Sequence, residues 1–425
     1  MTNTNLKSHI TNGNLDPKFT ELYGADNVLA SRDRYINAID KFTELFGERD
    51  NLALYSAPGR TEIGGNHTDH NLGKVLAASI NLDVIAIVSQ TDTNTITVKS
   101  EGHSKNVVDI SNLSANASEF GNSTALIRGI AAKFAETGKS IGGLDAYTTS
   151  NVLKGSGLSS SAAFSVLIGT ILSGEFNQMT VNPVEIAQIA QYAENVYFGK
   201  PCGLMDQTAS SVGGIISIDF ADNANPIIKK INVDFAKSGY ALCIVDTGGS
   251  HADLTDEYAS IPTEMKSIAA HFGKEVMRQV TRGQVLANAK QLREQFGDRA
   301  VMRALHYLDE NQRVDNQQSA LESGDFDEFK RQIIKSGNSS YKYLQNIYTN
   351  KDVAAQGLSL ALYLAESLLE DCGAYRVHGG GFGGTTQNFV PLELTAKFKQ
   401  EMESVFGVDS CHILQIRNIG GAKIV

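Results

Sequence analysis

Tryptophan is absent from this chain, and cysteine and proline are scarce, with four and seven residues among 425. Cys202, Cys243, Cys372 and Cys411 lie about 40 or more residues apart and form no CxxC pair. The spacing indicates neither a zinc site nor a disulfide framework, and it is typical of a protein from a reducing compartment.

Long apolar runs and clusters of positive charge are also lacking. The polar segment 1–19 has no signal-peptide core, and every longer apolar stretch is interrupted well short of a membrane span. The formal net charge is −10 and the lysines and arginines are dispersed, which argues against a nucleic-acid or anionic-membrane partner. We therefore expect an acidic cytoplasmic enzyme.

The length of the chain and the order of its expected elements indicate two domains. Single hydrophobic cores stop growing at roughly 250–300 residues, so a chain of 425 residues favours two cores. Strands and helices interleave too irregularly for a doubly wound sheet, which makes α+β the expected class. We place the boundary near residue 236, giving domains 1–236 and 237–425. The supporting elements are strands at 75–90, 94–102, 214–220, 240–247, 374–379 and 385–391, a helix at 124–138 and a mainly helical stretch that ends at about residue 370.

Two glycine-containing stretches match phosphate-binding patterns only superficially. The sequence TGKS at 137–140 lacks the earlier glycine of a P-loop, since Lys133 stands there, and it ends a helix instead of beginning one. The sequence GGGFGG at 379–384 fits GxGxxG, but a predicted strand follows it and no βαβ unit surrounds it. We interpret the first as a helix cap and reject a dinucleotide site at the second.

Segment 145–172 carries a stronger signal for an anion site. An alternating strand leads into KGSGLSSSA, and a helix follows whose first turn contains the serines 159–161. Unpaired N–H groups and the dipole at a helix N-terminus attract anions, and Gly155 and Gly157 would let a polyphosphate approach the backbone. A serine-rich cap after a flexible turn is the alternative, although one capping serine would suffice.

Two acidic residues follow in AENVYFGKPCGLMDQ, residues 193–207. Asp206 precedes a predicted helix and could simply cap it, and Glu194 alone would pass for a solvated helix residue. Beside a phosphate loop, however, one carboxylate could hold Mg²⁺ while the other accepts a proton from an attacking hydroxyl. These segments together outline a phosphotransfer site.

Four ordered motifs resemble those of the GHMP small-molecule kinases and, within that superfamily, the galactokinase family. The motifs are APGRTEIGGNHTDH, KGSGLSSSAAF, GKPCGLMDQ and VHGGGFGG. The first is similar to the galactokinase signature GRVNLIGEHTDYNGG, and the third to that family's catalytic segment. Weaker similarity at 307–314 and 320–340 extends the resemblance over nearly the whole chain.

The resemblance implies an N-terminal α/β domain, a ferredoxin-like C-terminal domain and an active site in the cleft between them. It implies an ATP-dependent sugar 1-kinase that converts ATP and galactose to ADP and galactose 1-phosphate, the initial step of galactose metabolism. The implied ligands are a small sugar, ATP and Mg²⁺, with no nucleic acid and no membrane. The motifs carry no information on oligomeric state, and a monomer is compatible with them.

The resemblance also assigns roles to individual residues. Asp206 would accept the proton of the C1 hydroxyl or orient that hydroxyl, and Arg60 would neutralise charge on the moving phosphoryl group. Mg²⁺ would lie between Ser161 and Glu194, and Asp69 would be the main selector of the sugar because a carboxylate can accept from two adjacent hydroxyls. The sugar would contact Asn66, His67, Asp69, Gly203 and Tyr258; ATP would lie against Gly155, Ser156, Gly157, Leu158, Ser159 and Ser160; and Gly380, Gly381 and Gly383 would lie near the phosphates.

Several residues depart from the family pattern, above all Asn66, which stands where the family has a Glu that contacts the C6 hydroxyl. Drift within a divergent galactokinase would explain the change. Loss of a negative charge would instead favour a sugar with a C6 carboxylate, such as galacturonate. N-acetylgalactosamine as substrate and a catalytically silent sugar- and ATP-binding regulator are further alternatives. The other departures are Glu62, His70, Leu153, Ile261 with Pro262, Gly337 and His378.

Overall fold

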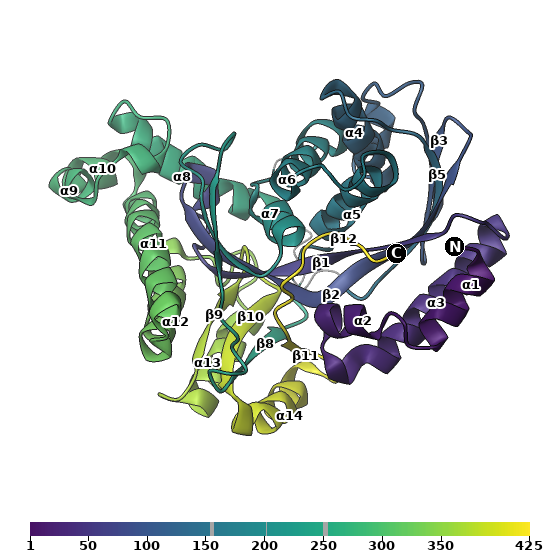
Figure 1. Cartoon of the computed structure of the whole chain (residues 1–425). Coiled ribbons are helices and arrows are strands. Elements are labelled where there is room, and N and C mark those ends of the chain that lie inside the picture. Colours follow the sequence, from purple (N-terminus) through teal and green to yellow (C-terminus); the bar gives the residue numbers. More distant parts are fainter. Residues whose placement is uncertain (154–156, 201, 250–253) are drawn as a thin grey trace.

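The computed structural model describes residues 1–153, 157–200, 202–249 and 254–425, which form two β-sheets surrounded by helices (Figure 1). The first sheet has eight strands and the second has four. Helices and strands mix without regular alternation, so the α+β prediction is confirmed. None of the helices described combines the length and the apolar character that crossing a membrane requires.

The eight-stranded sheet is built around two long antiparallel strands, β1 (Ala53–Gly64) and β2 (Lys74–Thr91). The others are β3 (Thr95–Ser100), β4 (Lys105–Asp109), β5 (Gly143–Ser150), β6 (Ile215–Asp219), β7 (Ile227–Ile231) and β12 (Ala422–Lys423). The order is β12-β1-β2-β5-β3-β4, with β6 beside β2 and β7 beside β6. All twelve residues of β1 are buried, so the first motif starts from a rigid strand.

Alternate side chains of these strands enter two separate cores, because successive residues of a strand point to opposite faces. Tyr55 and Ala86 belong to a core that includes side chains of α4 (Ser123–Glu136), α5 (Ser160–Phe176) and α6 (Pro183–Tyr192). Leu54 and Ile85 instead pack with α1 (Asn3–Thr11), α2 (Asp16–Tyr23) and α3 (Val28–Phe46). Figure 1 shows these two helical groups on opposite sides of the sheet.

The four-stranded sheet contains β8 (Tyr240–Asp246), β9 (Ala374–His378), β10 (Thr385–Pro391) and β11 (Cys411–Leu414). Its order is β11-β8-β10-β9, and every pairing is antiparallel. With α13 (Gly357–Leu369) before β9 and α14 (Thr395–Phe406) before β11, this is the βαββαβ arrangement of a ferredoxin-like fold. The other helices between β8 and β9 are α8 (Thr255–His271), α9 (Arg282–Ala287), α10 (Ala289–Phe296), α11 (Asp298–Ser323) and α12 (Phe326–Ser339).

The two sheets meet at the end of β1. Arg376 on β9 donates to the carbonyl of Ile63 at 2.8 Å, and Gln387 on β10 donates to the carbonyl of Glu62 at 2.9 Å. The chain leaves the first sheet after Ile231 and joins the second at Tyr240, and β12 then returns to the first. The boundary near residue 236 stays a prediction, but the first motif clearly lies where the two sheets join.

Candidate active site

Arg60 and Asp206 form an ion pair that joins the first motif to the third. Arg60 lies on β1, and Asp206 lies in the first turn of α7 (Met205–Val212). Nε and Nη2 of Arg60 donate to the two carboxylate oxygens at 2.7 and 2.8 Å, a bidentate geometry that is strong and directional. The Arg60 side chain is 7% exposed and the Asp206 side chain 31%. A buried cation therefore orients a carboxylate that ligands can reach.

Asp206 is ionised at neutral pH. Burial alone would raise its pKa, but the charge and hydrogen bonds of Arg60, with a hydrogen bond from Ser159, hold the pKa of the carboxyl below its ordinary value. A carboxylate with such a low pKa is a weak base at pH 7. Asp206 is therefore better suited to accepting a hydrogen bond from a hydroxyl, and so orienting it, than to removing its proton in advance.

The glycine- and serine-rich loop contacts the same ion pair. Gly157 has a φ of +71°, a left-handed conformation that suits glycine, and its carbonyl accepts from Nη1 of Arg60. The carbonyl of Leu158 accepts the backbone N–H of Arg60 at 3.1 Å, and Leu158 itself is buried. The Ser159 hydroxyl donates to Asp206. The loop and the ion pair are thus one hydrogen-bonded unit.

Helix α5 begins directly after this loop, at Ser160. Ser159, the residue before it, has a φ of 57° and makes no side-chain cap, since its hydroxyl contacts Asp206 instead. A serine cap is therefore not the function of this residue, and α5 begins without a side-chain cap from Ser159. N–H groups at the N-terminus of a helix are of the kind that attract anions. Gly155 and Ser156, also predicted to contact ATP, lie outside the described residues.

Glu194 lies in a π-helical turn, η4 (Ala193–Phe198), and such turns are frequent at functional sites. It is 5% exposed, and its Oε2 accepts from Sγ of Cys202 at 2.9 Å and from Nε2 of Gln207 at 2.8 Å. Burial raises the pKa of Glu194, while hydrogen bonds from Cys202 and from Ser161 act against the rise. Ser161 and Glu194 thus place a hydroxyl and a carboxylate together at the start of α5.

His67 and Asp69 lie in the loop after β1, which we call the sugar loop (residues 65–71). Oδ1 of Asp69 accepts the N–H of His70 at 2.9 Å, and a Cβ at Gly203 would come within 2.0 Å of its Oδ2. Only glycine permits that approach. Burial lowers the pKa of His67 to about 4, so the neutral ring donates from Nε2 to the carbonyl of Gly380 at 2.9 Å and keeps Nδ1 as an acceptor.

The fourth motif, VHGGGFGG, contacts the sugar loop through His67 and also packs against Tyr258. The Tyr258 hydroxyl donates to the carbonyl of Gly381 at 2.6 Å. A Cβ at Gly380 would lie 2.4 Å from the Tyr258 ring, and one at Gly381, where φ is +83°, would lie 1.9 Å from the carbonyl oxygen of Asn346. These two glycines therefore shape the packing, and Gly383 follows in the bend that leads to β10.

The Asn66 side chain has no exposed surface. Its Nδ2 donates to Glu62 Oε1 at 3.1 Å and to the carbonyl of Gly379 at 2.7 Å, and its Oδ1 accepts from Ser340 and Asn346 at 3.1 and 2.8 Å. This arrangement differs from the predicted sugar contact, because every polar group of the amide is already paired within the protein. Asn66 instead ties the sugar loop to the fourth motif, VHGGGFGG.

Glu62 supplies a carboxylate next to Asn66. Nη2 of Arg376 donates to its Oε1 at 2.7 Å, and both side chains are buried. Burial raises the pKa of Glu62, while the charges of Arg376 and Arg60 partly offset the rise. A carboxyl group, which the family pattern has at position 66, is therefore present at position 62, one hydrogen bond from the Asn66 amide.

Sequence reasoning missed the helix that holds the sugar loop, α11. Glu310 accepts the N–H groups of Gly65 and Asn66 at 3.2 and 3.4 Å, and His306 donates from Nε2 to the carbonyl of Asn66 at 3.0 Å. Tyr307 donates to the carbonyl of residue 71 at 2.8 Å. His306, Tyr307 and Glu310 stand at positions i, i+1 and i+4 of the helix, which places them on one buried face of a mostly polar segment. This spacing was the sequence signal that could have identified the helix as a support of the loop.

Acid should destabilise the protein through His67 and His306. Burial lowers the pKa of each ring to about 4 from 6.5, so below pH 6.5 the unfolded chain binds protons that the folded chain does not. We expect the free energy of unfolding to be fully retained above pH 6.5 and to fall toward pH 4, by up to about 1.4 kcal/mol per pH unit for each histidine. Denaturant titrations at pH 7, 6 and 5 measure this slope.

The His306→Gln variant separates the two contributions. Glutamine retains a donor for the carbonyl of Asn66 but takes up no proton. The slope of the free energy of unfolding against pH should therefore decrease by up to about 1.4 kcal/mol per pH unit. His103→Gln, at an exposed position, is the control and should leave the slope unchanged. Equal slopes for the wild type and His306→Gln would contradict the role given to His306.

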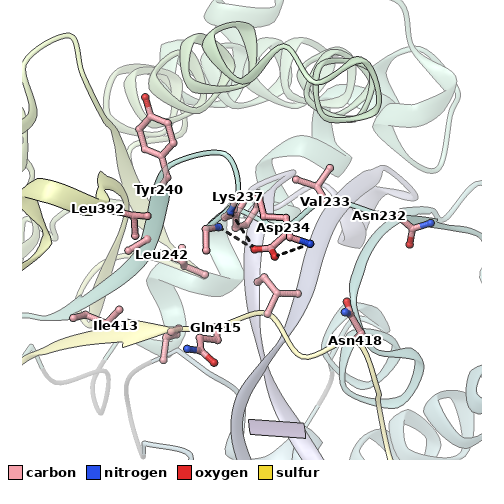
Figure 2. Close-up of a pocket in the computed structure, with 15 residues that line it drawn as sticks. Asn232, Val233, Asp234, Lys237, Tyr240, Leu242, Leu392, Ile413, Gln415 and Asn418 are labelled. Atoms are coloured by element: carbon pink, nitrogen blue, oxygen red, sulfur yellow. Dashed lines mark hydrogen bonds and ion pairs between the residues drawn. The ribbon is translucent and has the colours of Figure 1, made fainter. Parts of the chain in front are cut away.

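A cavity of about 670 Å³ lies away from these residues, between the segment that links the two sheets and the segment that returns to the first (Figure 2). Asn232, Lys237, Tyr240, Gln415 and Asn418 are among its lining residues. None of the predicted site residues lines this cavity, and none of the four motifs contributes a lining residue to it.

Two family models match the segments that contain the site. The galactokinase galactose-binding signature matches residues 40–90, and the GHMP kinases N terminal domain matches residues 125–214. The chain is 29% identical over 348 residues to a galactokinase of Streptomyces coelicolor, covering 81% of this chain and 86% of the relative. It is 30% identical over 359 residues to a galactokinase of Actinobacillus pleuropneumoniae serotype 3, covering 84% and 89%.

Solved structures share the fold. The match to Lactococcus lactis galactokinase complexed with galactose has a TM-score of 0.77 at 23% identity and covers 90% of this chain and 98% of that one. Methanococcus jannaschii mevalonate kinase matches with a TM-score of 0.61 at 16% identity, covering 87% and 99%.

Fold and motifs define a kinase of the GHMP superfamily, a phosphotransferase with an alcohol group as acceptor. The 30% identity over most of both chains places it further: the chain belongs to the galactokinase family.

Proposed function

We propose that this chain transfers the γ-phosphoryl group of ATP to the C1 hydroxyl of galactose. The observation that carries the proposal is the Arg60–Asp206 ion pair, which lies between the phosphate loop and the sugar loop. Ser159 connects the pair to the phosphate loop, and the contact of Asp69 with Gly203 brings the sugar loop to the segment that precedes Asp206. Membership of the galactokinase family supports galactose and ATP as the two substrates.

In the proposed reaction, the C1 oxygen bonds to the γ-phosphorus while the bond from that phosphorus to the β–γ bridging oxygen breaks. The products are ADP and galactose 1-phosphate, and the hydroxyl proton passes to Asp206 late in the step or to solvent. Asp206 fixes the direction of the hydroxyl, and the buried charge of Arg60 stabilises the charge on the transferring group. Asp69 and Nδ1 of His67 accept hydrogen bonds from the sugar hydroxyls.

Ser161 and Glu194 would hold Mg²⁺, which when bound neutralises charge on the ATP phosphates. Mg²⁺ usually takes one or two carboxylates together with substrate phosphates, not an all-protein cage. Within the part of the chain that the structure describes, no group of three or more His, Cys, Asp or Glu side chains could hold a metal ion, so binding would depend on the nucleotide. The residues fit such an ion, since Oε1 of Gln207, beside Glu194, is buried and has no hydrogen-bond partner among the residues described.

Two of the alternatives lose support. The galacturonate hypothesis depends on the loss of a carboxyl group at position 66, and Glu62 supplies a carboxyl group beside Asn66. A silent regulator would be expected to have a damaged ion pair or phosphate loop, whereas Arg60, Asp206 and Ser159 form a complete network.

The test is release of ADP from Mg-ATP by the purified protein with D-galactose, N-acetylgalactosamine, glucose, L-arabinose and galacturonate. Galactose is expected to give the fastest turnover. Preference for another sugar would contradict the substrate assignment, and binding of sugar and ATP in calorimetry without ADP release would contradict the assignment as an enzyme.

The Gly203→Ala variant should raise KM for galactose by on the order of 10-fold or more. A methyl group at this position meets Oδ2 of Asp69, so the carboxylate must move away from the sugar. KM for ATP should change much less, because the three nearest atoms that an added Cβ would meet all belong to Asp69. Gly283→Ala, where an added Cβ meets nothing within 4 Å, is the control. An unchanged KM for galactose in Gly203→Ala would remove Asp69 from the sugar site.

A further inference from the structure

Gln207 follows Asp206 in α7, but its side chain serves a different group. It is 1% exposed, and its Nε2 donates to Oε2 of Glu194 at 2.8 Å. The same Nε2 lies 3.5 Å from Sγ of Cys202, which itself donates to Oε2 of Glu194 at 2.9 Å. One oxygen of Glu194 is thus held by two donors from the segment that carries Asp206.

The backbone around Glu194 is fixed as closely as its carboxylate. A Cβ at Gly129 on α4 would come within 2.8 Å of the Tyr197 ring and 2.9 Å of the Ala193 Cβ, so α4 packs directly against the π-helical turn. Tyr197 also donates to the carbonyl of Leu113 at 2.9 Å. The turn therefore has little freedom, and the remaining torsions of Glu194 are set by Cys202 and Gln207.

The other amide atom of Gln207, Oε1, is buried and has no hydrogen-bond partner in the part of the chain that the structure describes. A buried carbonyl oxygen without a partner loses about 1–3 kcal/mol relative to a satisfied one, so native proteins rarely leave one unused. Gln207 lies 13 residues after Glu194 in the sequence, and its side-chain amide contacts the Glu194 carboxylate. Its Oε1 is an acceptor that no donor among the described residues uses.

We propose that Gln207 is a positioning residue of the metal site: its Nε2 holds the carboxylate of Glu194, and its Oε1 accepts a hydrogen bond from a water on the bound Mg²⁺. The inference rests on the proposed function, which assigns Glu194 to the metal. Cys202 is the second donor that fixes the same oxygen. Residues that orient a metal ligand in this way typically change metal affinity by 10–100-fold when removed.

The test is titration of Mn²⁺, as a spectroscopic substitute for Mg²⁺, into the protein–ADP complex, with free Mn²⁺ followed by electron paramagnetic resonance. Gln207→Met has the same side-chain length without the amide and should weaken Mn²⁺ binding by on the order of 10-fold. Its affinity for ADP in the presence of EDTA should stay within about twofold of the wild type, because the amide acts through the metal. Gln188→Met removes an amide on α6 that donates to the carbonyl of Ala224 at 2.8 Å, and as the matched control it should leave Mn²⁺ affinity unchanged.

Variants of Cys202 give a rescue. Cys202→Ala should weaken Mn²⁺ binding, and Cys202→Ser, which keeps a donor for Glu194, should restore most of it. Mn²⁺ affinity of Gln207→Met within about twofold of the wild type would overturn the inference, and so would an equal loss of metal-free ADP binding, which marks a structural role. If the wild-type protein binds Mn²⁺ in its ADP complex but forms no ADP from Mg-ATP with any of the sugars, the result would contradict only the proposed function.

Discussion

The Asp206→Asn variant is expected to lower kcat for galactose phosphorylation by about 10³-fold. Asparagine preserves the shape of the side chain and one acceptor for Arg60, but it removes the negative charge that fixes the sugar hydroxyl. It also leaves the Arg60 guanidinium, 7% exposed, without a counterion. An unpaired buried cation would be attracted to the nucleotide phosphates, so KM for ATP should not rise. Steady-state ADP release at saturating galactose and ATP measures the effect.

Asp315→Asn is the matched control for this variant. Asp315 pairs with Lys74 at 2.7 Å, but its side chain is 41% exposed, and exposed ion pairs contribute little to stability. Its kcat should stay within about twofold of the wild type. Thermal unfolding of both variants separates loss of catalysis from loss of folded protein. A kcat for Asp206→Asn above about a tenth of the wild-type value would show that the carboxylate is not part of the reaction.

The sequence predicted those parts of the site that are encoded locally. The strand predicted at 240–247 is β8, Tyr240–Asp246, because alternation and β-branched residues are properties of the segment itself. The helix predicted at 124–138 ends at Glu136, with Gly138 in the left-handed conformation just after it. The two rejected glycine motifs are likewise a helix end and a turn before a strand. The position of the glycine- and serine-rich loop before α5 could be located for the same reason, since a strand, two glycines and a helix start lie within thirty residues, while its contacts with ATP stay a prediction.

The direction of individual side chains could not be predicted, because it depends on residues far away in the sequence. Asn66 is buried by Asn346, 280 positions later, and its loop is held by Glu310 and His306 on α11, 244 and 240 positions later. A motif reports which residue types occur in a loop, but packing against a distant helix decides which of them face a ligand. The N-terminal helices, α1–α3, were not predicted either, since they carry no motif and only a modest apolar face.

Asn66→Glu should lower the free energy of unfolding by about 3 kcal/mol more than Asn66→Gln does. Both variants add one methylene to a fully buried position, so Asn66→Gln measures the cost of size alone. The glutamate also places a second carboxylate against Glu62, whose Oε1 lies 3.1 Å from Nδ2 of Asn66, and it faces the carbonyl of Gly379 without a donor. One of the two acids must then stay protonated at pH 7. Denaturant titration at pH 7 gives the comparison.

The same experiment in a Glu62→Gln background shows whether the positive charge of Arg376 can compensate a carboxylate at position 66 as well as at position 62. Arg376 and the Asn66 amide donate to the same oxygen of Glu62, at 2.7 and 3.1 Å, so we expect the guanidinium to compensate a carboxylate at either position. The penalty of glutamate over glutamine at position 66 should therefore fall below about 1 kcal/mol when Glu62 is neutral. A penalty that is equal in both backgrounds would mean that the carboxylates do not interact.

Because the amide has no exposed surface, the ratio of galactose to galacturonate turnover should be the same in the wild type and in Asn66→Gln, and a changed ratio would return Asn66 to the sugar site.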